Sequence, residues 1–212
     1  MKIVMINGSP RQGKSNSERF LNRLEPLLGS GHEILPVRVN KAHIDEESLK
    51  LICSADVLVL AFPLYSDGIP SQLFRLLVSL EEPMKKEQKQ GIAVYALINN
   101  GFYEGKQNHV AFDILKNWCR RLGLSYGGGV GLGAGEMLGS LEKVPLGKGP
   151  LKNLGTALEE IANRILSKEK GDPIFINPNF PRVLWKLSGT YFFWNATAKK
   201  NGLTKKDLMR RL

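Results

Sequence analysis

The sequence has few of the residues that build disulfide frameworks or metal centres. Only two of its 212 residues are cysteine, Cys53 and Cys119, and no Cys-x-x-Cys pair occurs. Two distant cysteines cannot form a disulfide framework, and they leave no ligand set for a zinc or iron–sulfur site. We therefore expect both cysteines to be reduced and packed in the interior, and we expect no metal site.

Long apolar runs are also missing. No segment approaches the roughly 20 apolar residues that a helix needs to cross a bilayer. The first residues, MKIVMING, pass from a short apolar run directly into a turn, without the longer apolar core of a secretory signal. We expect a cytoplasmic protein, in which the glycosylation sequon at Asn195 has no meaning.

Acidic residues are scarce toward the C-terminus. The chain has 30 Lys and Arg against 20 Asp and Glu, and residues 171–212 carry eight of the basic residues but only two acidic ones. The same residues hold seven of the 17 aromatic side chains. We therefore predict two parts: one domain over residues 1–170, and a basic, aromatic-rich helical extension over residues 171–212.

Apolar runs alternate with helical patterns along the first part. The expected strands cover residues 2–7, 32–39, 56–63 and 91–99, with at most one short strand within 126–135. The expected helices begin after Ser15 and then cover residues 46–55, 69–80, 111–122 and 151–165. This alternation predicts an α/β fold with a five-stranded parallel sheet between two helical layers. Residues 126–149 are so rich in glycine that we expect a mobile loop.

Three segments rich in Gly, Ser, Asn, Pro or aromatic residues follow three of the expected strands. They read NGSPRQGKSNS, FPLYSDGIP and NNGFYEGKQNH. In a parallel sheet the carboxyl ends of the strands meet at one edge, and ligands bind there, near the point where the strand order reverses. We expect the three segments to converge on one pocket.

The first segment contains GSPRQGKS (residues 8–15), which matches the nucleoside-triphosphate loop G-x-x-x-x-G-K-[ST]. Such a site also needs an acidic Mg²⁺ ligand at the end of a neighbouring strand, and none is present. Pro10 further removes a backbone N–H from the loop. A phosphate monoester fits better, because hydroxyl, guanidinium and amide donors lie at the positive end of a helix; they are Ser9, Arg11, Ser15, Asn16 and Ser17. Ser15 also begins an S-x-x-E capping box, so its hydroxyl has an alternative role.

These motifs resemble the flavodoxin-like NADPH-dependent FMN reductases and the related NAD(P)H-dependent oxidoreductases. The resemblance rests on GSPRQGKSNS (8–17), FPLYSDGIPSQLFRLL (62–77) and NNGFYEG (99–105), and it covers the chain to about residue 168. It implies a flavodoxin-like three-layer sandwich that binds FMN. The cysteine cluster of the iron–sulfur relatives is absent.

The resemblance also implies roles for individual residues. Ser9, Arg11, Ser15, Asn16 and Ser17 would hold the FMN phosphate. Pro63, Leu64 and Tyr65 would line the ribityl chain and one edge of the isoalloxazine ring, and Asn100, Gly101 and Phe102 would approach its pyrimidine edge.

The implied activity is hydride transfer from NAD(P)H to bound FMN, and from there to a quinone, azo or nitro compound or a flavin. Such chemistry needs no side-chain nucleophile, and the catalytic residues stay unknown; His109, Glu104 and Tyr103 are weak candidates. The alternative is an FMN-binding electron-transfer protein that does not react with NAD(P)H. The basic surface argues against it, since small electron-carrier flavodoxins are usually acidic.

The extension has three possible partners. Its aromatic residues could pack on its own domain or across a homodimer, an interfacial helix could rest on anionic lipid, or basic and aromatic side chains could bind nucleic acid. We expect a homodimer or higher oligomer first, peripheral membrane contact second, and nucleic acid last.

Overall fold

The structure is a computed structural model that describes residues 1–41, 44–87, 91–204 and 206–210. The chain divides into two compact units, Met1–Pro178 and Asn179–Leu212. The first unit ends later than the boundary that we predicted after residue 170. Within the described residues, no helix is both long and apolar enough to cross a membrane.

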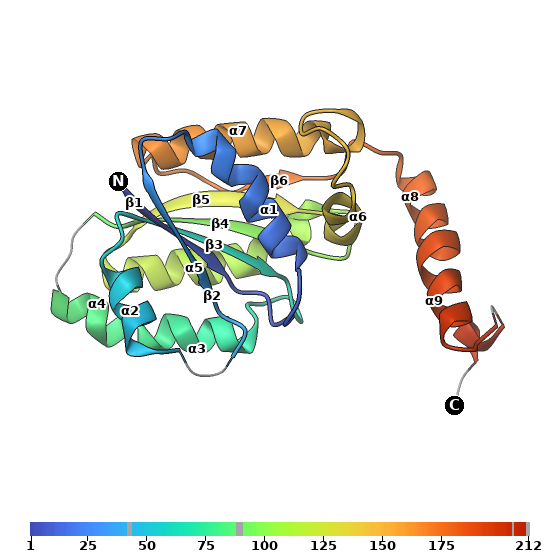
Figure 1. Cartoon of the computed structure of the whole chain (residues 1–212), viewed down its shortest axis with the longest axis horizontal. Coiled ribbons are helices and arrows are strands. Elements are labelled where there is room, and N and C mark those ends of the chain that lie inside the picture. The colour runs from blue at the N-terminus through green and yellow to red at the C-terminus, as the bar shows by residue number, and fades with distance from the viewer. Residues whose placement is uncertain (42–43, 88–90, 205, 211–212) are drawn as a thin grey trace. The chain divides into compact units, whose positions relative to one another are not determined.

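The first unit is built on a parallel sheet with the strand order β2-β1-β3-β4-β5-β6 (Figure 1). The strands are β1 (Lys2–Asn7), β2 (Glu33–Arg38), β3 (Val57–Pro63), β4 (Ala93–Asn99), β5 (Ser125–Leu132) and β6 (Ile174–Ile176). Each strand pairs in parallel with its neighbours. The prediction of five strands is corrected to six. The extra strand, β6, has three residues, too few to show the periodicity that identifies a strand in a sequence.

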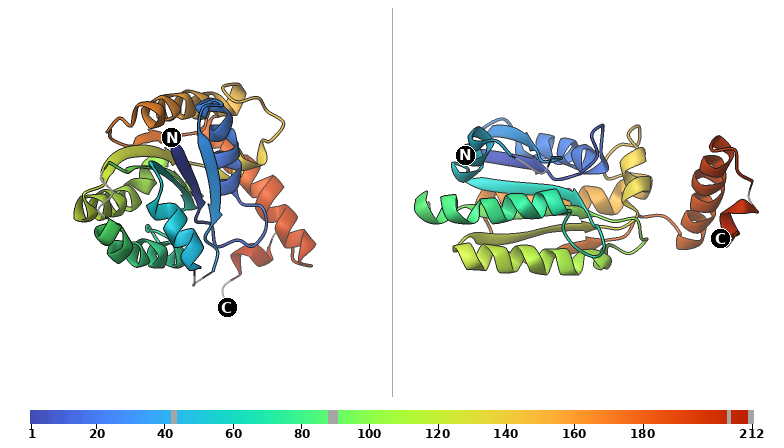
Figure 2. Two further views of the ribbon diagram at one scale, coloured as in Figure 1. Left: turned by 60° about the vertical axis from the view of Figure 1, so that its left-hand side comes forward. Right: turned by 90° about the horizontal axis from the view of Figure 1, so that it is seen from below.

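Helices cover both faces of this sheet (Figures 1 and 2). One face carries α1 (Asn16–Leu24) and α7 (Lys152–Ser167), with the short α6 (Gly135–Ser140); the other carries α2 (Glu46–Cys53), α3 (Ser71–Ser79), α4 (Glu81–Glu87) and α5 (His109–Leu122). Sequence reasoning missed α4 and α6, which hold too few apolar residues to show a helical period.

The strands divide their side chains between two buried cores. In β1, Ile3 and Met5 pack on the α1 and α7 side, whereas Val4 and Ile6 pack on the other side. This alternation follows from the two-residue period of a strand. A sheet that is covered on both faces needs apolar residues at successive positions, and β1, β3 and β4 have them.

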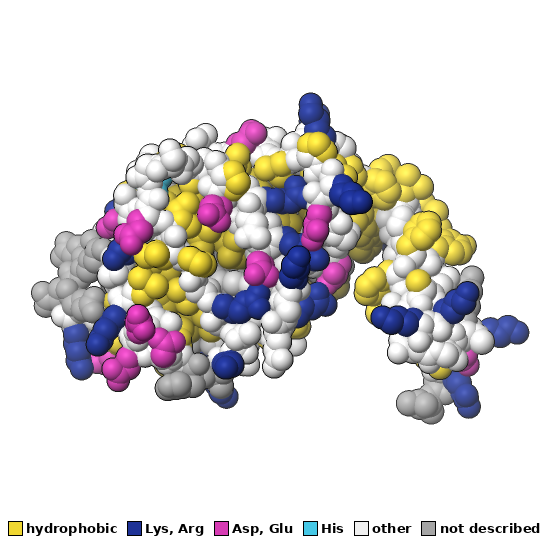
Figure 3. All heavy atoms as spheres, viewed as in Figure 1, with side chains coloured by type: hydrophobic (Ala, Val, Ile, Leu, Met, Phe, Trp, Pro, Cys, Tyr) yellow, Lys and Arg dark blue, Asp and Glu magenta, His cyan; other side chains and the backbone are white. Residues whose placement is uncertain are grey.

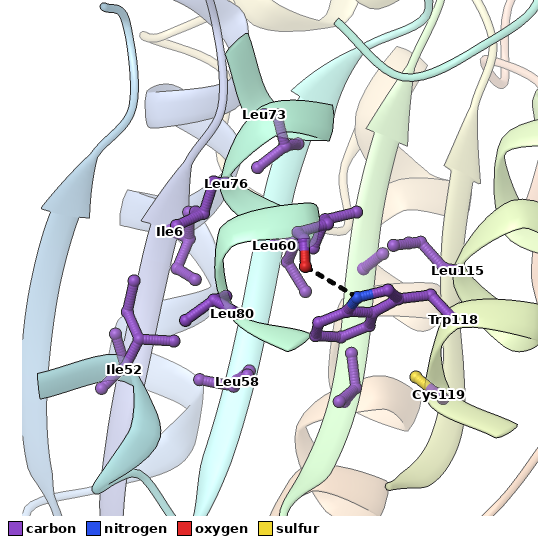
Figure 4. Close-up of a cluster of buried hydrophobic side chains, with 14 of the residues drawn as sticks. Ile6, Ile52, Leu58, Leu60, Leu73, Leu76, Leu80, Leu115, Trp118 and Cys119 are labelled. Atoms are coloured by element: carbon purple, nitrogen blue, oxygen red, sulfur yellow. Dashed lines mark hydrogen bonds between the residues drawn. The ribbon is translucent and has the colours of Figure 1, made fainter. Parts of the chain in front are cut away.

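The core beneath α3 and α5 contains Trp118 and Cys119 (Figure 4). The Trp118 indole Nε1 donates a hydrogen bond to the Leu77 carbonyl at 3.0 Å, which joins α5 to α3. Burial raises the pKa of the Cys119 thiol to about 12. Cys53 is also buried, which confirms the prediction that both cysteines pack in the interior.

The glycine-rich segment after residue 125 begins with a strand whose register against β4 shifts between Val94 and Ala96, which corrects the expectation of a short strand and a mobile loop. Strand β5 covers eight residues, SYGGGVGL, and most of them are buried. A Cβ atom on Gly127 would collide with the Tyr95 ring, and one on Gly129 would collide with the Ala96 carbonyl. The glycines are therefore required by close packing between β4 and β5, not by mobility.

The strand order reverses between β1 and β3, because β2 lies on one side of this pair and β4, β5 and β6 lie on the other. The order of the first five strands is that of a flavodoxin-like doubly wound sheet, and β6 extends its edge. In such sheets the crevice for a ligand opens beyond the carboxyl ends of the two strands at the reversal.

The second unit is a helical segment, as predicted. It contains α8 (Arg182–Ser188), a π-helical segment η4 (Gly189–Trp194), α9 (Asn195–Lys200) and a 3₁₀ turn η5 (Asp207–Met209). The backbone of Gly202 has a φ of 72°, and the Leu203 N–H donates to the Ala198 carbonyl at 2.9 Å. This left-handed glycine ends the helix.

Candidate functional site

Hydrogen bonds join the carboxyl ends of β1, β3 and β4. The Gly8 N–H donates to the Ala61 carbonyl at 2.8 Å, and the Leu64 N–H donates to the Asn99 carbonyl at 2.8 Å. The Asn99 side chain then donates through Nδ2 to Ser17 Oγ at 3.2 Å. These bonds confirm that the three predicted segments converge at one edge of the sheet.

The buried Asn7 side chain forms hydrogen bonds with both ends of the loop from β1 to α1. Its Oδ1 accepts a hydrogen bond from the Ser9 N–H at 3.1 Å, and its Nδ2 donates to Ser15 Oγ at 3.3 Å. Ser15 Oγ also accepts from the Glu18 N–H at 3.2 Å, and the Ser15 N–H donates to the Glu18 carboxylate at 3.4 Å, which completes a capping box. The Ser15 hydroxyl is therefore engaged as the helix cap.

Arg38, at the end of β2, fixes the outer side of the same loop. Its guanidinium donates to the carbonyls of Gln12 at 3.0 Å and Gly13 at 3.4 Å, and it forms an ion pair with Glu18 at 2.9 Å. Sequence reasoning missed this contact, because no local pattern relates Arg38 to a loop that lies 25 residues earlier.

The loop and the first turn of α1 present free backbone donors. Among the described residues, none accepts a hydrogen bond from the backbone N–H groups of Gln12, Gly13, Lys14, Asn16 and Ser17. Free N–H groups at a helix N-terminus, together with the positive end of the helix dipole, make a binding site for an anion.

The other predicted phosphate ligands differ in exposure. Ser9, Asn16 and Ser17 are buried, whereas Arg11 is exposed. Asn16 Oδ1 accepts a hydrogen bond from Arg19 Nη1 at 2.9 Å, so this side chain already has a protein partner. The hydroxyl of Ser17 accepts from Asn99, which leaves its own proton available to a ligand.

The segment after β3 forms a tight hairpin at Tyr65–Gly68. The Tyr65 N–H donates to the Gly68 carbonyl at 3.1 Å, and the Gly68 N–H donates back to the Tyr65 carbonyl at 2.8 Å. Ser66 and Asp67 have φ angles of 45° and 60°, as a type I′ turn requires. The turn follows Pro63 and Leu64 directly, and the Tyr65 side chain is 53% exposed.

The segment after β4 is shaped by the buried Asn100 side chain. Asn100 Oδ1 accepts from the Phe102 N–H at 2.9 Å, and Nδ2 donates to the Glu104 carbonyl at 3.1 Å. Phe102 is 54% exposed. A Cβ atom on Gly101 would meet nothing within 4 Å, so packing within the protein does not explain this glycine.

Helix α6 supplies two further residues that sequence reasoning missed. A Cβ atom on Gly139 would collide with the Asn16 side chain, and one on Gly135 would lie 2.9 Å from Asn99 Oδ1. Gly135 and Gly139 are four residues apart, so they lie on the same face of the helix. That spacing was the available signal for a helix packed closely against the site.

A hollow of about 530 Å³ lies beside α1, away from Tyr65 and Phe102. Its wall includes an ion pair between Arg19 Nε and Glu142 at 2.7 Å, and Arg23 donates to the Leu141 carbonyl at 2.8 Å. Partial burial lowers the pKa of Arg23. Because these charged groups already bond to protein partners, we interpret the hollow as the groove between α1 and the segment after α6. Its lining residues are Lys14, Glu18, Arg19, Asn22, Arg23, Glu142, Val144, Pro145 and Leu146.

Among the residues that the structure describes, the geometry identifies no general acid or base. His109 is exposed at the start of α5, and its Nδ1 lies 3.2 Å from the Lys106 carbonyl, which is a local contact at a helix end. In the described part of the chain, no group of three or more His, Cys, Asp or Glu side chains could hold a metal ion.

No protein-family model matches the sequence, and no curated protein sequence matches it. Solved structures do share the fold. NADH:FMN oxidoreductase (EMOB), in its apo form, superposes with a TM-score of 0.62 at 17% identity, over 87% of this chain and 98% of that chain. An azoreductase from Bacillus anthracis str. Sterne superposes with a TM-score of 0.54 at 15% identity, over 79% of this chain and 99% of that chain.

A structure described as a flavodoxin, WrbA-like protein, from Agrobacterium tumefaciens superposes with a TM-score of 0.55 at 12% identity, over 79% of this chain and 95% of that chain. At these identities the likeness shows the flavodoxin-like fold. The structural neighbours are of the kind that the resemblance in sequence indicated, since they include an FMN oxidoreductase, an azoreductase and a flavodoxin.

Proposed function

We propose that the first unit binds FMN and acts as an NAD(P)H-dependent oxidoreductase. It would pass electrons to a small acceptor such as a quinone, an azo or nitro compound or a flavin. The observation that carries the proposal is the set of five free N–H groups in residues 12–17, at the edge of the sheet that also carries the exposed rings of Tyr65 and Phe102. The likeness to an NADH:FMN oxidoreductase and an azoreductase supports it.

The donor set fits a phosphate monoester better than a triphosphate. A triphosphate loop uses its Ser or Thr hydroxyl as a Mg²⁺ ligand, but here the Ser15 hydroxyl caps the helix. The neighbouring strands β3 and β4 end at Pro63 and Asn99, neither of which is acidic. Backbone N–H groups and the Ser9 and Ser17 hydroxyls remain as neutral donors to a dianion.

The same residues would orient the flavin. When bound, FMN supplies the capacity to accept a hydride from nicotinamide and to pass electrons on. The loop at residues 9–17 would fix the phosphate, and Pro63, Leu64 and Tyr65 would cover the ribityl chain and one edge of the ring. Asn100, Gly101 and Phe102 would hold the pyrimidine edge and shield it from water.

Binding is tested by comparing FMN with riboflavin, which lacks the phosphate. We expect the purified protein to bind FMN at least about tenfold more tightly than riboflavin, because charge-assisted hydrogen bonds contribute about 1.5–3 kcal/mol. Arg11→Ala should weaken FMN binding and leave riboflavin binding unchanged, whereas Lys50→Ala, a matched removal of an exposed cation, should change neither. Tight ATP binding without FMN binding would overturn the proposal.

Reactivity is tested by mixing the FMN-loaded protein with NADPH or NADH without oxygen. We expect the flavin absorbance near 450 nm to be bleached within seconds. FMN binding without bleaching by either nucleotide would instead identify an FMN-binding electron-transfer protein. The basic surface disfavours that alternative, because the net charge of +10 is opposite in sign to that of a typical carrier flavodoxin.

A further inference from the structure

The second unit exposes an unusual concentration of apolar side chains. Of the 15 large hydrophobic residues that are exposed in the described part of the chain, nine lie between residues 183 and 208. Phe192 is 82% exposed and Val183 is 68% exposed. Exposed apolar side chains gathered in this way mark a binding surface.

The described residues of the unit form no core that could explain these exposed side chains. Among the described residues after Pro178, only Ala198 is buried. Helices α8, η4 and α9 run without interruption from Arg182 to Lys200. In proteins most helical stability comes from packing of an apolar face, and this helix exposes its large apolar side chains. The unit therefore needs a surface on which to pack.

Charge indicates which kind of surface it is. Residues 179–212 contain eight Lys and Arg residues and a single acidic residue, Asp207, so the unit carries a formal charge of +7. No acidic residue occurs from 179 to 206. In Figure 3, apolar side chains cover α8 and η4, whereas Lys and Arg side chains gather toward α9 and the turn beyond it. Apolar side chains next to basic side chains are complementary to a binding surface that has an apolar interior and anionic groups at its exterior.

We propose that residues 179–212 bind the surface of an anionic lipid bilayer. Phe192, Phe193 and Trp194 would enter the boundary between headgroups and acyl chains, where aromatic side chains are favoured. The neighbouring Lys199 and Lys200 would meet the anionic headgroups, each contributing through the negative surface potential. This interaction is independent of flavin binding by the first unit.

Two other partners fit less well. A second copy of the chain would bring the same charge of +7 against the first, and like charges oppose association. Nucleic acid would accept the basic and aromatic side chains, but the exposed aliphatic Val183, Leu184 and Leu187 offer nothing to bases or phosphates. Lipid acyl chains accommodate both aliphatic and aromatic side chains.

The experiment is sedimentation of the full chain with vesicles of phosphatidylcholine containing 30% phosphatidylglycerol, and with vesicles of phosphatidylcholine alone. We expect binding at least about tenfold tighter to the anionic vesicles, weakened by salt. Tryptophan emission should shift to shorter wavelength on binding, because Trp194 is 58% exposed in the free chain whereas Trp118 is already buried.

Two variants of the second unit should each weaken this binding at least about tenfold: Phe192→Ser with Trp194→Ser, and Lys199→Glu with Lys200→Glu. Matched changes in the first unit should leave the affinity for anionic vesicles unchanged. They are Phe74→Ser with Val78→Ser, and Lys41→Glu with Lys50→Glu. These control positions are exposed in α3 and around α2. Unchanged melting temperatures would exclude loss of folding as the cause.

Four results would overturn the proposal. The first is no binding to anionic vesicles, and the second is equal binding to both kinds of vesicle. The third is a lipid-free dimer in sedimentation velocity that Phe192→Ser with Trp194→Ser dissociates, which would assign the surface to a second copy. The fourth is tighter binding to single-stranded nucleic acid than to vesicles, lost in the same variants.

Discussion

Asn99 and Ser17, which are 82 residues apart in the sequence, are joined by a hydrogen bond of 3.2 Å between buried side chains. The same Asn99 Nδ2 also donates to the Phe62 carbonyl at 3.1 Å. One amide group therefore ties β4 both to the end of β3 and to the first turn of α1. The candidate phosphate loop is positioned by the sheet itself.

Asn99→Ala should destabilise the first unit. The change leaves the Phe62 carbonyl and the Ser17 hydroxyl without a buried donor, which costs about 1–3 kcal/mol of unfolding free energy. Urea denaturation measures this loss, and Asn22→Ala, which removes an exposed amide, is the control. Equal unfolding free energies for the two variants would mean that the bond contributes nothing.

Ser15→Ala and Ser17→Ala should have different effects. Loss of the Ser15 cap should lower the unfolding free energy by about 1 kcal/mol, as removal of a helix cap usually does. If FMN binds as proposed, Ser17→Ala should weaken its binding more than Ser15→Ala does. The Ser15 hydroxyl donates its proton to Asn7 Oδ1 at 3.4 Å, whereas the Ser17 proton is available to a ligand. Calorimetric titration of both folded variants with FMN provides the comparison. A larger loss of affinity for Ser15→Ala would mean that the Ser15 hydroxyl itself contacts the FMN phosphate.

Gly129→Ala should be strongly destabilising. The added methyl group would collide with the Ala96 carbonyl, and Gly129 has a φ of 153°, which L side chains rarely adopt. We expect a loss of more than about 2 kcal/mol in chemical denaturation. Gly13→Ala is the matched substitution, because a Cβ atom there meets nothing within 4 Å and should change stability by less than about 1 kcal/mol. Similar losses in both variants would contradict the packing of β5.

The two thiols should react only when the protein unfolds. Cys53 and Cys119 are buried, and burial raises the pKa of Cys119 to about 12, so its thiolate is scarce even at pH 9. Labelling with iodoacetamide in increasing urea, followed by mass spectrometry, should track the unfolding transition at pH 8 and at pH 9. Rapid labelling of Cys119 in native conditions would mean that α5 opens locally.

Alkaline pH should destabilise the protein through Tyr95. Burial, followed by the nearby Glu169 carboxylate, raises the pKa of its phenol to about 12, and the hydroxyl lies 2.7 Å from the Arg164 carbonyl, to which it donates. The unfolded chain loses this proton near pH 10, so between pH 10 and 12 the folded state holds the extra proton and stability falls as pH rises. Tyr95→Phe should remove part of that slope in urea denaturation at pH 9, 10 and 11. An unchanged slope would contradict the assignment.

The sequence predicted the sheet well where strands were long and fully apolar. The β1, β3 and β4 strands and the helices after them follow from uninterrupted apolar runs and from capping signals such as Ser15 with Glu18. The prediction placed a strand within residues 126–135 but was wrong about its length and about a mobile loop, because glycines are typical of loops. The glycines of β5 are needed because the Tyr95 ring and the Ala96 backbone of the neighbouring strand β4 lie too close for a Cβ atom. The sequence around the glycines does not reveal these neighbours.

The candidate site could be predicted to a similar extent. The ends of apolar strands can be recognised in a sequence, so the three segments that meet at the carboxyl edge of the sheet were identified correctly. Contacts from distant elements were not, and both Arg38 from β2 and Gly139 from α6 were missed. Such contacts depend on the order of the strands, which a single sequence does not reveal.

The short strand β6 fixes the point at which the chain leaves the first unit. Because β6 is parallel to β5, its carboxyl end lies at the edge of the sheet that carries the candidate site. Asn177 Oδ1 accepts a hydrogen bond there from the Gly105 N–H at 2.9 Å, and the second unit begins two residues later. The chain therefore leaves the first unit at the same edge of the sheet as the candidate site.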